Sequence, residues 1–80
     1  MQTAYVLISC DPEDIEGIIT MLNTISNISE ANRVEGPYDI LVKINAESPE
    51  KLKEIISIEL RKIERIKHTL TLTAIQNKSS

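Results

Sequence analysis

Two helix-opening signals divide this chain, and each one follows an apolar run of strand length. Asp11-Pro12-Glu13 comes after the first run, and Ser48-Pro49-Glu50 comes after a later one. An Asp or Ser side chain can accept a hydrogen bond from a free first-turn amide, and Pro suits the first helical position. Acidic residues also favour the positive end of a helix. The sequence therefore predicts two helices, each entered from a strand.

Four segments have the composition and alternation of β-strands. Their ranges are 3–9, 28–35, 38–45 and 67–75. The second segment carries charges, which is typical of an edge strand because charged side chains discourage pairing with other chains. Gly36-Pro37 interrupts the chain between the second and third segments and predicts a hairpin there.

Apolar side chains at helical spacing follow both opening signals. The first stripe contains Ile15, Ile18, Ile19, Leu22 and Ile25. The second stripe contains Leu52, Ile55, Ile56, Leu60 and Ile63. They predict helices that begin at the two signals; the first ends within 23–27 and the second near Glu64. Four cations near the second helix end complement its negative terminus, with a phosphate or nucleic-acid patch as the alternative: Arg61, Lys62, Arg65 and Lys67.

The element order βαββαβ predicts an α+β domain of the ferredoxin-like kind. Two right-handed strand–helix–strand crossovers put both helices on one face of a four-stranded antiparallel sheet. We expect this single domain to cover residues 1–76, with a polar C-terminal tail at 77–80.

The second face of the predicted sheet has no helix to cover it. We expect it to be lined by Tyr5, Leu7 and Leu41, together with the threonine row of the last strand, which includes Thr69 and Thr71. An open face with three large apolar side chains is unfavourable in water. The sequence therefore predicts a homodimer, formed sheet to sheet or edge to edge.

Size and composition narrow the function further. Eighty residues provide room for one core, and chains of this size often gain burial by oligomerising. A net charge of -3 and only two aromatic residues disfavour a general nucleic-acid binder. One cysteine and one histidine provide neither a disulfide nor a zinc ligand set. We therefore expect no metal and no cofactor. Because the sequence has no apolar run long enough to span a membrane, it also predicts a cytoplasmic protein with no membrane contact.

Individual candidate residues each have a structural alternative. Asp39 begins a central strand beside a turn, where it can meet a polar ligand or merely cap the hairpin. Thr69 and Thr71 are polar side chains on a strand where threonine alternation is also ordinary. Cys10 precedes three acidic residues, which oppose a reactive thiolate, so we expect it to be inert.

The inventory contains no nucleophile–base pair, no phosphate-binding glycine loop and no carboxylate pair, so we expect no enzyme activity. Two groups of ferredoxin-like proteins can be tested on the segment after the first strand. Heavy-metal carriers need a CxxC there, and acylphosphatases need a glycine-rich loop with an arginine. Ser9-Cys10-Asp11-Pro12 supplies neither.

Three segments together resemble one known family. They are residues 30–42 with the turn Gly36-Pro37-Tyr38-Asp39, the helix opening Ser48-Pro49-Glu50-Lys51-Leu52, and the strand Ile66-Lys67-His68-Thr69-Leu70-Thr71. Their order and spacing are similar to the effector domain of the Lrp/AsnC regulators, also called the RAM domain. The resemblance covers nearly the whole chain.

The resemblance implies a ferredoxin-like domain that dimerises through its sheets, assembles into rings and binds small effectors, typically amino acids, between subunits. Matched by position, the implied ligand-binding residues are Gly36, Pro37, Tyr38, Asp39, Thr69 and Thr71. The chain begins its first strand at residue 3, so we expect a stand-alone effector domain without the helix-turn-helix domain and without direct DNA binding.

Such a domain would bind an effector and could co-assemble with full-length Lrp/AsnC regulators. Two alternatives stay open. One is a purely structural assembly partner of those regulators, and the other is a small dimeric enzyme of ferredoxin-like fold.

Overall fold

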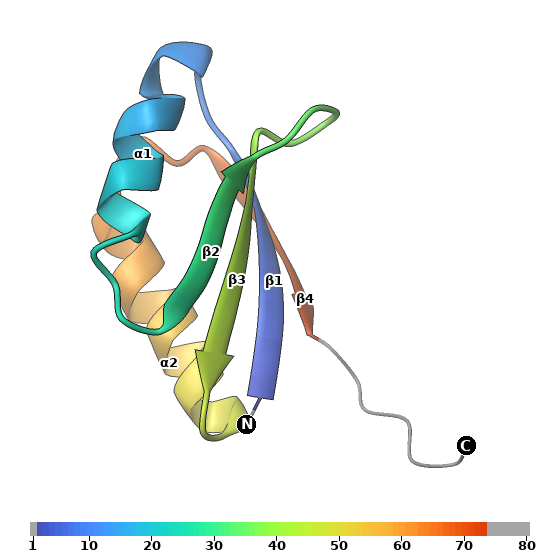
Figure 1. The fold of residues 1–80 in the computed structure, drawn as a ribbon, viewed down its shortest axis with the longest axis vertical. Coiled ribbons are helices and arrows are strands. Elements are labelled where there is room, and N and C mark those ends of the chain that lie inside the picture. Colours follow the sequence, from blue (N-terminus) through green and yellow to red (C-terminus); the bar gives the residue numbers. More distant parts are fainter. Residues whose placement is uncertain (1, 74–80) are drawn as a thin grey trace.

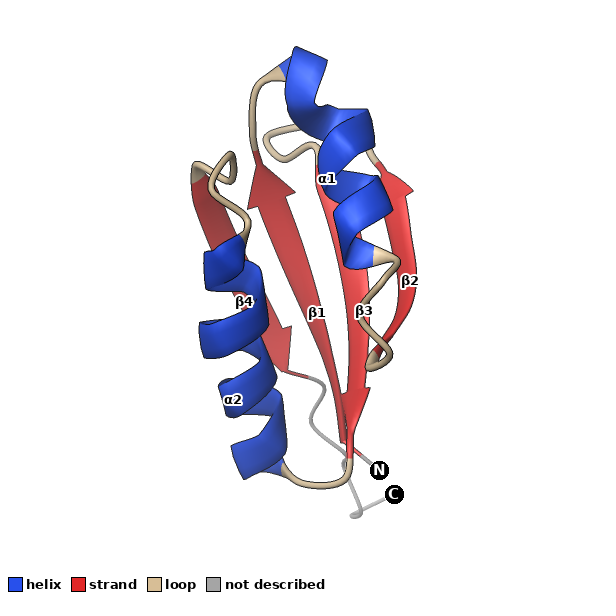
Figure 2. Cartoon of the chain, turned by 90° about the vertical axis from the view of Figure 1, so that its left-hand side faces the viewer, coloured by secondary structure: helices blue, strands red, loops and turns tan. Residues whose placement is uncertain are grey.

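The computed structural model describes residues 2–73. Its strands and helices follow in the order β1 (Gln2–Ser9), α1 (Ile15–Leu22), β2 (Ile28–Arg33), β3 (Ile40–Ala46), α2 (Pro49–Glu59) and β4 (His68–Thr73). The strands form one antiparallel sheet in the order β2-β3-β1-β4. Both helices pack on the same face of this sheet (Figures 1 and 2). The predicted ferredoxin-like α+β fold is confirmed; residues 74–80 of the predicted last strand and tail lie outside the described residues.

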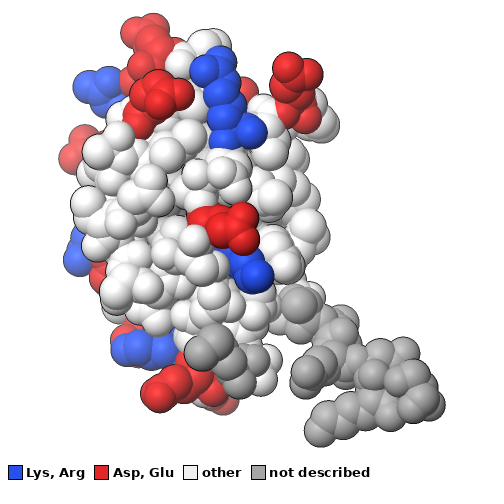
Figure 3. Space-filling view, in the orientation of Figure 1, with Lys and Arg blue, Asp and Glu red and all other residues white. Residues whose placement is uncertain are grey.

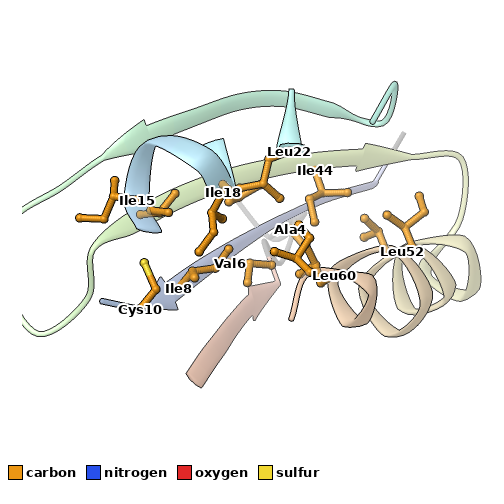
Figure 4. Close-up of a cluster of buried hydrophobic side chains, with 14 of the residues drawn as sticks. Ala4, Val6, Ile8, Cys10, Ile15, Ile18, Leu22, Ile44, Leu52 and Leu60 are labelled. Atoms are coloured by element: carbon orange, nitrogen blue, oxygen red, sulfur yellow. The ribbon is translucent and has the colours of Figure 1, made fainter. Parts of the chain in front are cut away.

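The core lies between the two helices and the central strands. On β1, Ala4, Val6 and Ile8 are at most 1% exposed, and each lies opposite a buried residue of β3. Isoleucine and leucine side chains of α1 and α2 reach this layer from the other side (Figure 4). The alternation predicted for the first and third strands is confirmed, because their buried sets both face the helices.

The two helix openings differ in how they are stabilised. Ser48 caps α2 as predicted, because its hydroxyl accepts a hydrogen bond from the Lys51 N–H at 3.1 Å. The prediction that Asp11 caps the first helix is wrong. The chain there makes a 3-10 turn at Pro12–Asp14 before α1 begins, and no side chain caps it. The Asp11 carboxylate instead accepts a hydrogen bond from Lys67 Nζ at 2.6 Å.

The second helix ends earlier than predicted. α2 stops at Glu59 and a 3-10 turn at Leu60–Lys62 follows it; the chain is extended at Ile63. Arg65 therefore lies beyond the helix end, as Lys67 does, and neither acts on the helix terminus. The Arg65 guanidinium pairs with the Asp14 carboxylate at 2.6 Å, so these two cations hold the segment before β4 against the start of α1.

The prediction that the threonine row of β4 lies on the open face of the sheet is wrong. The register of β4 places Thr69, Thr71 and Thr73 opposite Ile8, Val6 and Ala4, which are residues of the core face. Directly paired residues point to the same side of a sheet. The threonine row therefore lies on the helix side, and Leu70 and Leu72 occupy the open face. All six residues of β4 are exposed, so burial does not distinguish the two sides of this edge strand.

Gly17 lies on the exposed side of α1. Apart from its chain neighbours and the backbone of its own helix, a methyl group added there would have no heavy atom of the described residues within 4 Å. We therefore expect Gly17→Ala to stabilise the chain by about 0.5–1 kcal/mol, because glycine loses more backbone entropy than alanine in a helix. Chemical denaturation of the two proteins checks this. A Gly17→Ala variant that is less stable than the parent would instead point to another subunit packed closely on this position.

Candidate functional site

The sheet face opposite the helices carries five large apolar side chains, which we call the open apolar face: Tyr5, Leu7, Leu41, Leu70 and Leu72. Leu70 is 43% exposed and Leu72 is 49% exposed, while the other three are half-buried. Leu7 lies opposite Leu41 on one side and Leu70 on the other. Three neighbouring strands thus contribute apolar side chains to this face, and Lys43 of β3, which lies opposite Tyr5, is on the same face. Among residues 2–73, nothing covers it.

One end of this face is polar, and its polar side chains form hydrogen bonds with one another. The Thr3 hydroxyl donates to Asn45 Oδ1 at 2.8 Å, and Asn45 Nδ2 donates to the Ser29 hydroxyl at 3.0 Å. Side chains that already have partners cost less to bury than unpaired ones. This end therefore does not oppose contact with another apolar sheet.

The loop between β2 and β3 contains the predicted turn Gly36-Pro37-Tyr38-Asp39. Gly36 has a φ of 128°, a value that L side chains rarely adopt. The loop is closed by a backbone bond from the Val34 N–H to the Asp39 carbonyl at 2.9 Å. Gly36 and Pro37 are exposed, and Tyr38 is partly buried. The turn thus presents main chain and one ring at the end of the sheet.

Asp39 ties this loop to the end of β1. Its N–H donates to the Ile8 carbonyl at 2.8 Å, and its carboxylate Oδ2 accepts from the Cys10 N–H at 3.0 Å. The carboxylate therefore has a structural role within the chain, but it binds the end of β1 and not the hairpin turn that the structural alternative named. Its second oxygen, Oδ1, makes no hydrogen bond to the described residues.

Cys10 lies beneath this loop and is 6% exposed. Burial raises the pKa of its thiol, and the carboxylates of Asp39, Asp14 and Asp11 raise it further. A raised pKa leaves less thiolate at any pH below it, and the thiolate is the reactive form. This direction agrees with the prediction that Cys10 is inert.

We expect a thiol reagent at pH 8 to modify Cys10 at least about tenfold more slowly in the folded chain than in concentrated guanidinium chloride. The absorbance of the released chromophore measures both rates on the same sample. Equal rates in the two conditions would contradict both the burial of Cys10 and the electrostatic effect of its acidic neighbours.

The predicted site residues form two groups that do not meet within one chain. Thr69 lies opposite Ile8 on β4, and Asp39 precedes β3 on the other side of β1. Two strand spacings, roughly 10 Å, separate β3 from β4. Thr69 and Thr71 also point to the helix side of the sheet. A single small ligand can contact both groups only if a second copy supplies one of them.

Neither the charged side chains nor the potential metal ligands of the described residues indicate a further candidate site. In Figure 3, charged side chains gather at the two ends of the molecule, and one acidic and one basic side chain lie together between them, with uncharged surface around them. No three His, Cys, Asp or Glu side chains of residues 2–73 gather as metal ligands. Within the same residues, no helix has the length and apolar character to cross a membrane.

A family model described as the Lrp/AsnC ligand binding domain matches residues 3–80. The chain belongs to the Lrp/AsnC family. The predicted resemblance is therefore confirmed.

Curated relatives of this Lrp/AsnC domain include regulators and one enzyme. An uncharacterized HTH-type transcriptional regulator of Pyrococcus furiosus is 31% identical over 75 residues, which covers 90% of this chain and 50% of the regulator. A homocitrate synthase of Sulfurisphaera tokodaii is 32% identical over 83 residues, which covers 86% of this chain and 18% of the enzyme. The Lrp/AsnC domain thus spans only part of both proteins.

Solved structures agree with the fold. FFRP-DM1 has a TM-score of 0.88 and 29% identity, and the match covers 94% of this chain and all of the other. E. coli AsnC also has a TM-score of 0.88, at 22% identity, over 99% of this chain and 54% of AsnC. A transcriptional regulator of Neisseria meningitidis in complex with L-Met has a TM-score of 0.82 at 9% identity, over 99% of this chain and 53% of the regulator. The last two likenesses, at under 25% identity, show a shared fold.

Two open-face residues of this Lrp/AsnC domain, Leu70 and Leu72, are missing from the set predicted for a dimer interface. The alternation of β4 groups them correctly on one side, but the pattern alone does not say which side. Only the pairing of β4 with β1 decides it, because Leu70 and Leu72 lie opposite Leu7 and Tyr5.

Proposed function

We propose that this Lrp/AsnC domain is a non-enzymatic module that binds an amino-acid effector and assembles as a homodimer or a larger ring in the cytoplasm. The open apolar face is the observation that carries the proposal. Three adjacent strands contribute apolar side chains to it, and the polar group at its end is already satisfied. Large exposed apolar surfaces mark interaction sites, and a second copy supplies a surface of the same kind.

The effector site of this proposal is the turn at residues 36–39, completed by a neighbouring subunit. Exposed main chain at Gly36 offers hydrogen-bonding groups, and the Asp39 carboxylate suits an ammonium group. Thr69 and Thr71 contribute hydroxyls to the same ligand only from another copy. The L-Met complex of the Neisseria regulator, a protein of the same fold, supports an amino acid as the ligand class.

Calorimetric titration of the full chain against the twenty amino acids tests this proposal. We expect heat from at least one amino acid with a Kd in the micromolar to millimolar range, with one ligand per turn at most. No heat from any amino acid at millimolar concentration would favour the purely structural assembly partner. A small enzyme remains the less favoured alternative, since the described residues offer no nucleophile–base pair.

The module would act on transcription without contacting DNA itself. Its net charge of -3 opposes phosphate binding. The HTH-type relatives support co-assembly with DNA-binding regulators as the route to promoters. Salt-resistant operator binding by the isolated chain would contradict this part of the proposal, whereas binding only with an added full-length regulator would support it.

A further inference from the structure

Helix α2 and the edge strand β4 lie side by side (Figure 2), and a long hollow runs between them on the helix side of the sheet. We call it the α2–β4 groove and define it by Leu52, Ile56, Arg61, Thr69, Thr71 and Thr73. One part has a volume of 440 Å³ and the other 500 Å³. Both parts are lined by Ile56 and Ser57, so they meet at the middle of α2. Their sizes are in the usual range for small-molecule sites.

The two parts of the groove differ in chemistry. The first is lined by Ala4, Pro49, Leu52 and Ile56 with the methyl-bearing Thr71 and Thr73, and Lys53 lies on its rim. The second adds Arg61 and Lys67, with Glu64 as its acid and Thr69 as a hydroxyl. The groove therefore has an apolar end and a polar end that carries Arg61.

The charge of this groove contrasts with that of the whole chain. The chain has a net charge of -3, yet the groove has more cations than acids. Two other hollows have no such excess, since one is lined by Lys51, Glu54 and Glu59 and the other by Lys62 and Glu59. Because Asp11 neutralises Lys67, the cation available at the second part is Arg61, which forms no ion pair with residues 2–73.

We propose that the α2–β4 groove binds an aliphatic carboxylate, whose carboxylate group contacts the Arg61 guanidinium and the Thr69 hydroxyl. The hydrocarbon chain lies along Ile56 and Leu52. With a rise of 1.5 Å per residue to the end of α2 and about 2 Å in the 3-10 turn that follows, Leu52 and Arg61 are roughly 14–15 Å apart along the helix direction, which suits a medium-length chain. Guanidinium–carboxylate contacts are strong and directional, and the apolar wall adds burial. The groove is on the helix side, so a dimer formed through the open apolar face leaves it accessible.

Decanoate is the probe for this site, added to the isotope-labelled full chain below its micelle concentration. We expect saturable changes in the amide resonances of residues 52–61 and 69–73. Arg61→Glu should weaken binding at least about tenfold, because it replaces an attraction with a repulsion. Ser57→Trp should abolish binding by filling the middle of the groove. Decanol, which lacks the carboxylate, should bind at least about tenfold more weakly than decanoate.

Lys62→Glu is the matched control. It makes the same charge change one position further along, but its side chain lines a hollow between α1 and α2. We expect its decanoate affinity to stay within about twofold of the parent. Equal losses in Arg61→Glu and Lys62→Glu would overturn the assignment, as would resonance changes confined to the open apolar face. Thr69 and Thr71 belong to both proposed sites, but Arg61 and Ser57 line only the groove. No amino acid is present in this experiment, so the Arg61 and Ser57 variants test the groove separately from the proposed effector function.

Discussion

A Leu41→Lys variant is expected to be monomeric at micromolar concentrations at which the parent chain is a dimer. Leu41 is on the central strand β3, half-buried, and lies opposite Leu7 in the middle of the open apolar face. A lysine there would bring an unpaired ammonium group into an apolar contact, which costs several kcal/mol. We expect the dimer Kd to rise at least about a hundredfold. Sedimentation velocity over a concentration series measures the change.

Met21→Lys is the matched control for this experiment. Met21 is 48% exposed on α1, on the helix side of the molecule, so the same substitution should leave the dimer intact. Circular dichroism should show both variants folded, because neither replaces a buried core residue. A monomeric parent chain would refute the proposed assembly. A Leu41→Lys variant that stays dimeric would shift the interface to an edge of the sheet.

Two substitutions at Asp39 separate its structural role from its proposed role in effector binding. The carboxylate accepts a hydrogen bond from the Cys10 N–H, and an asparagine side chain keeps an oxygen acceptor but has no charge. Asp39→Asn should therefore retain most of the stability of the parent. It should also weaken amino-acid binding at least about tenfold, because the ligand ammonium loses its counter-charge.

Asp39→Ala removes the acceptor as well as the charge. We expect it to lower the free energy of unfolding by about 1–3 kcal/mol, since the Cys10 N–H is left without a partner in a partly buried place. Chemical denaturation and calorimetry on both variants give the two quantities separately. Unchanged amino-acid affinity in Asp39→Asn would end the assignment of Asp39 to the effector site and leave only its structural role.

The strands and helices were predictable because each has a sequence pattern with a physical cause. Ser48 caps its helix, and Ala4, Val6 and Ile8 alternate with half-buried residues. The end of α2 was not predictable from its apolar stripe, because Leu60 and Ile63 stay buried after the chain has left the α-helical conformation. Buried residues thus continue at helical spacing beyond the end of the helix.

The candidate site was less predictable than the fold. Asp11 has the right position and chemistry for a helix cap, but a cation 56 positions away in the sequence competes for its carboxylate. Local patterns carry no information on such a partner. The face of the threonine row was likewise undetermined, because an edge strand exposed on both sides shows no preference for either in its composition. Contacts between residues far apart in the sequence decide both: Lys67 binds Asp11, and β4 pairs with β1.

The two tyrosines lie at two different places in the fold, and the chain has no tryptophan or phenylalanine. Tyr5 is on the open apolar face and Tyr38 is in the turn beside Asp39. Each proposed event therefore has its own natural fluorophore: subunit association should change the emission of Tyr5, and ligand capture that of Tyr38. With Tyr38→Phe the remaining signal would report association alone, and with Tyr5→Phe it would report the ligand. The protein can be followed through both steps in solution without an attached label.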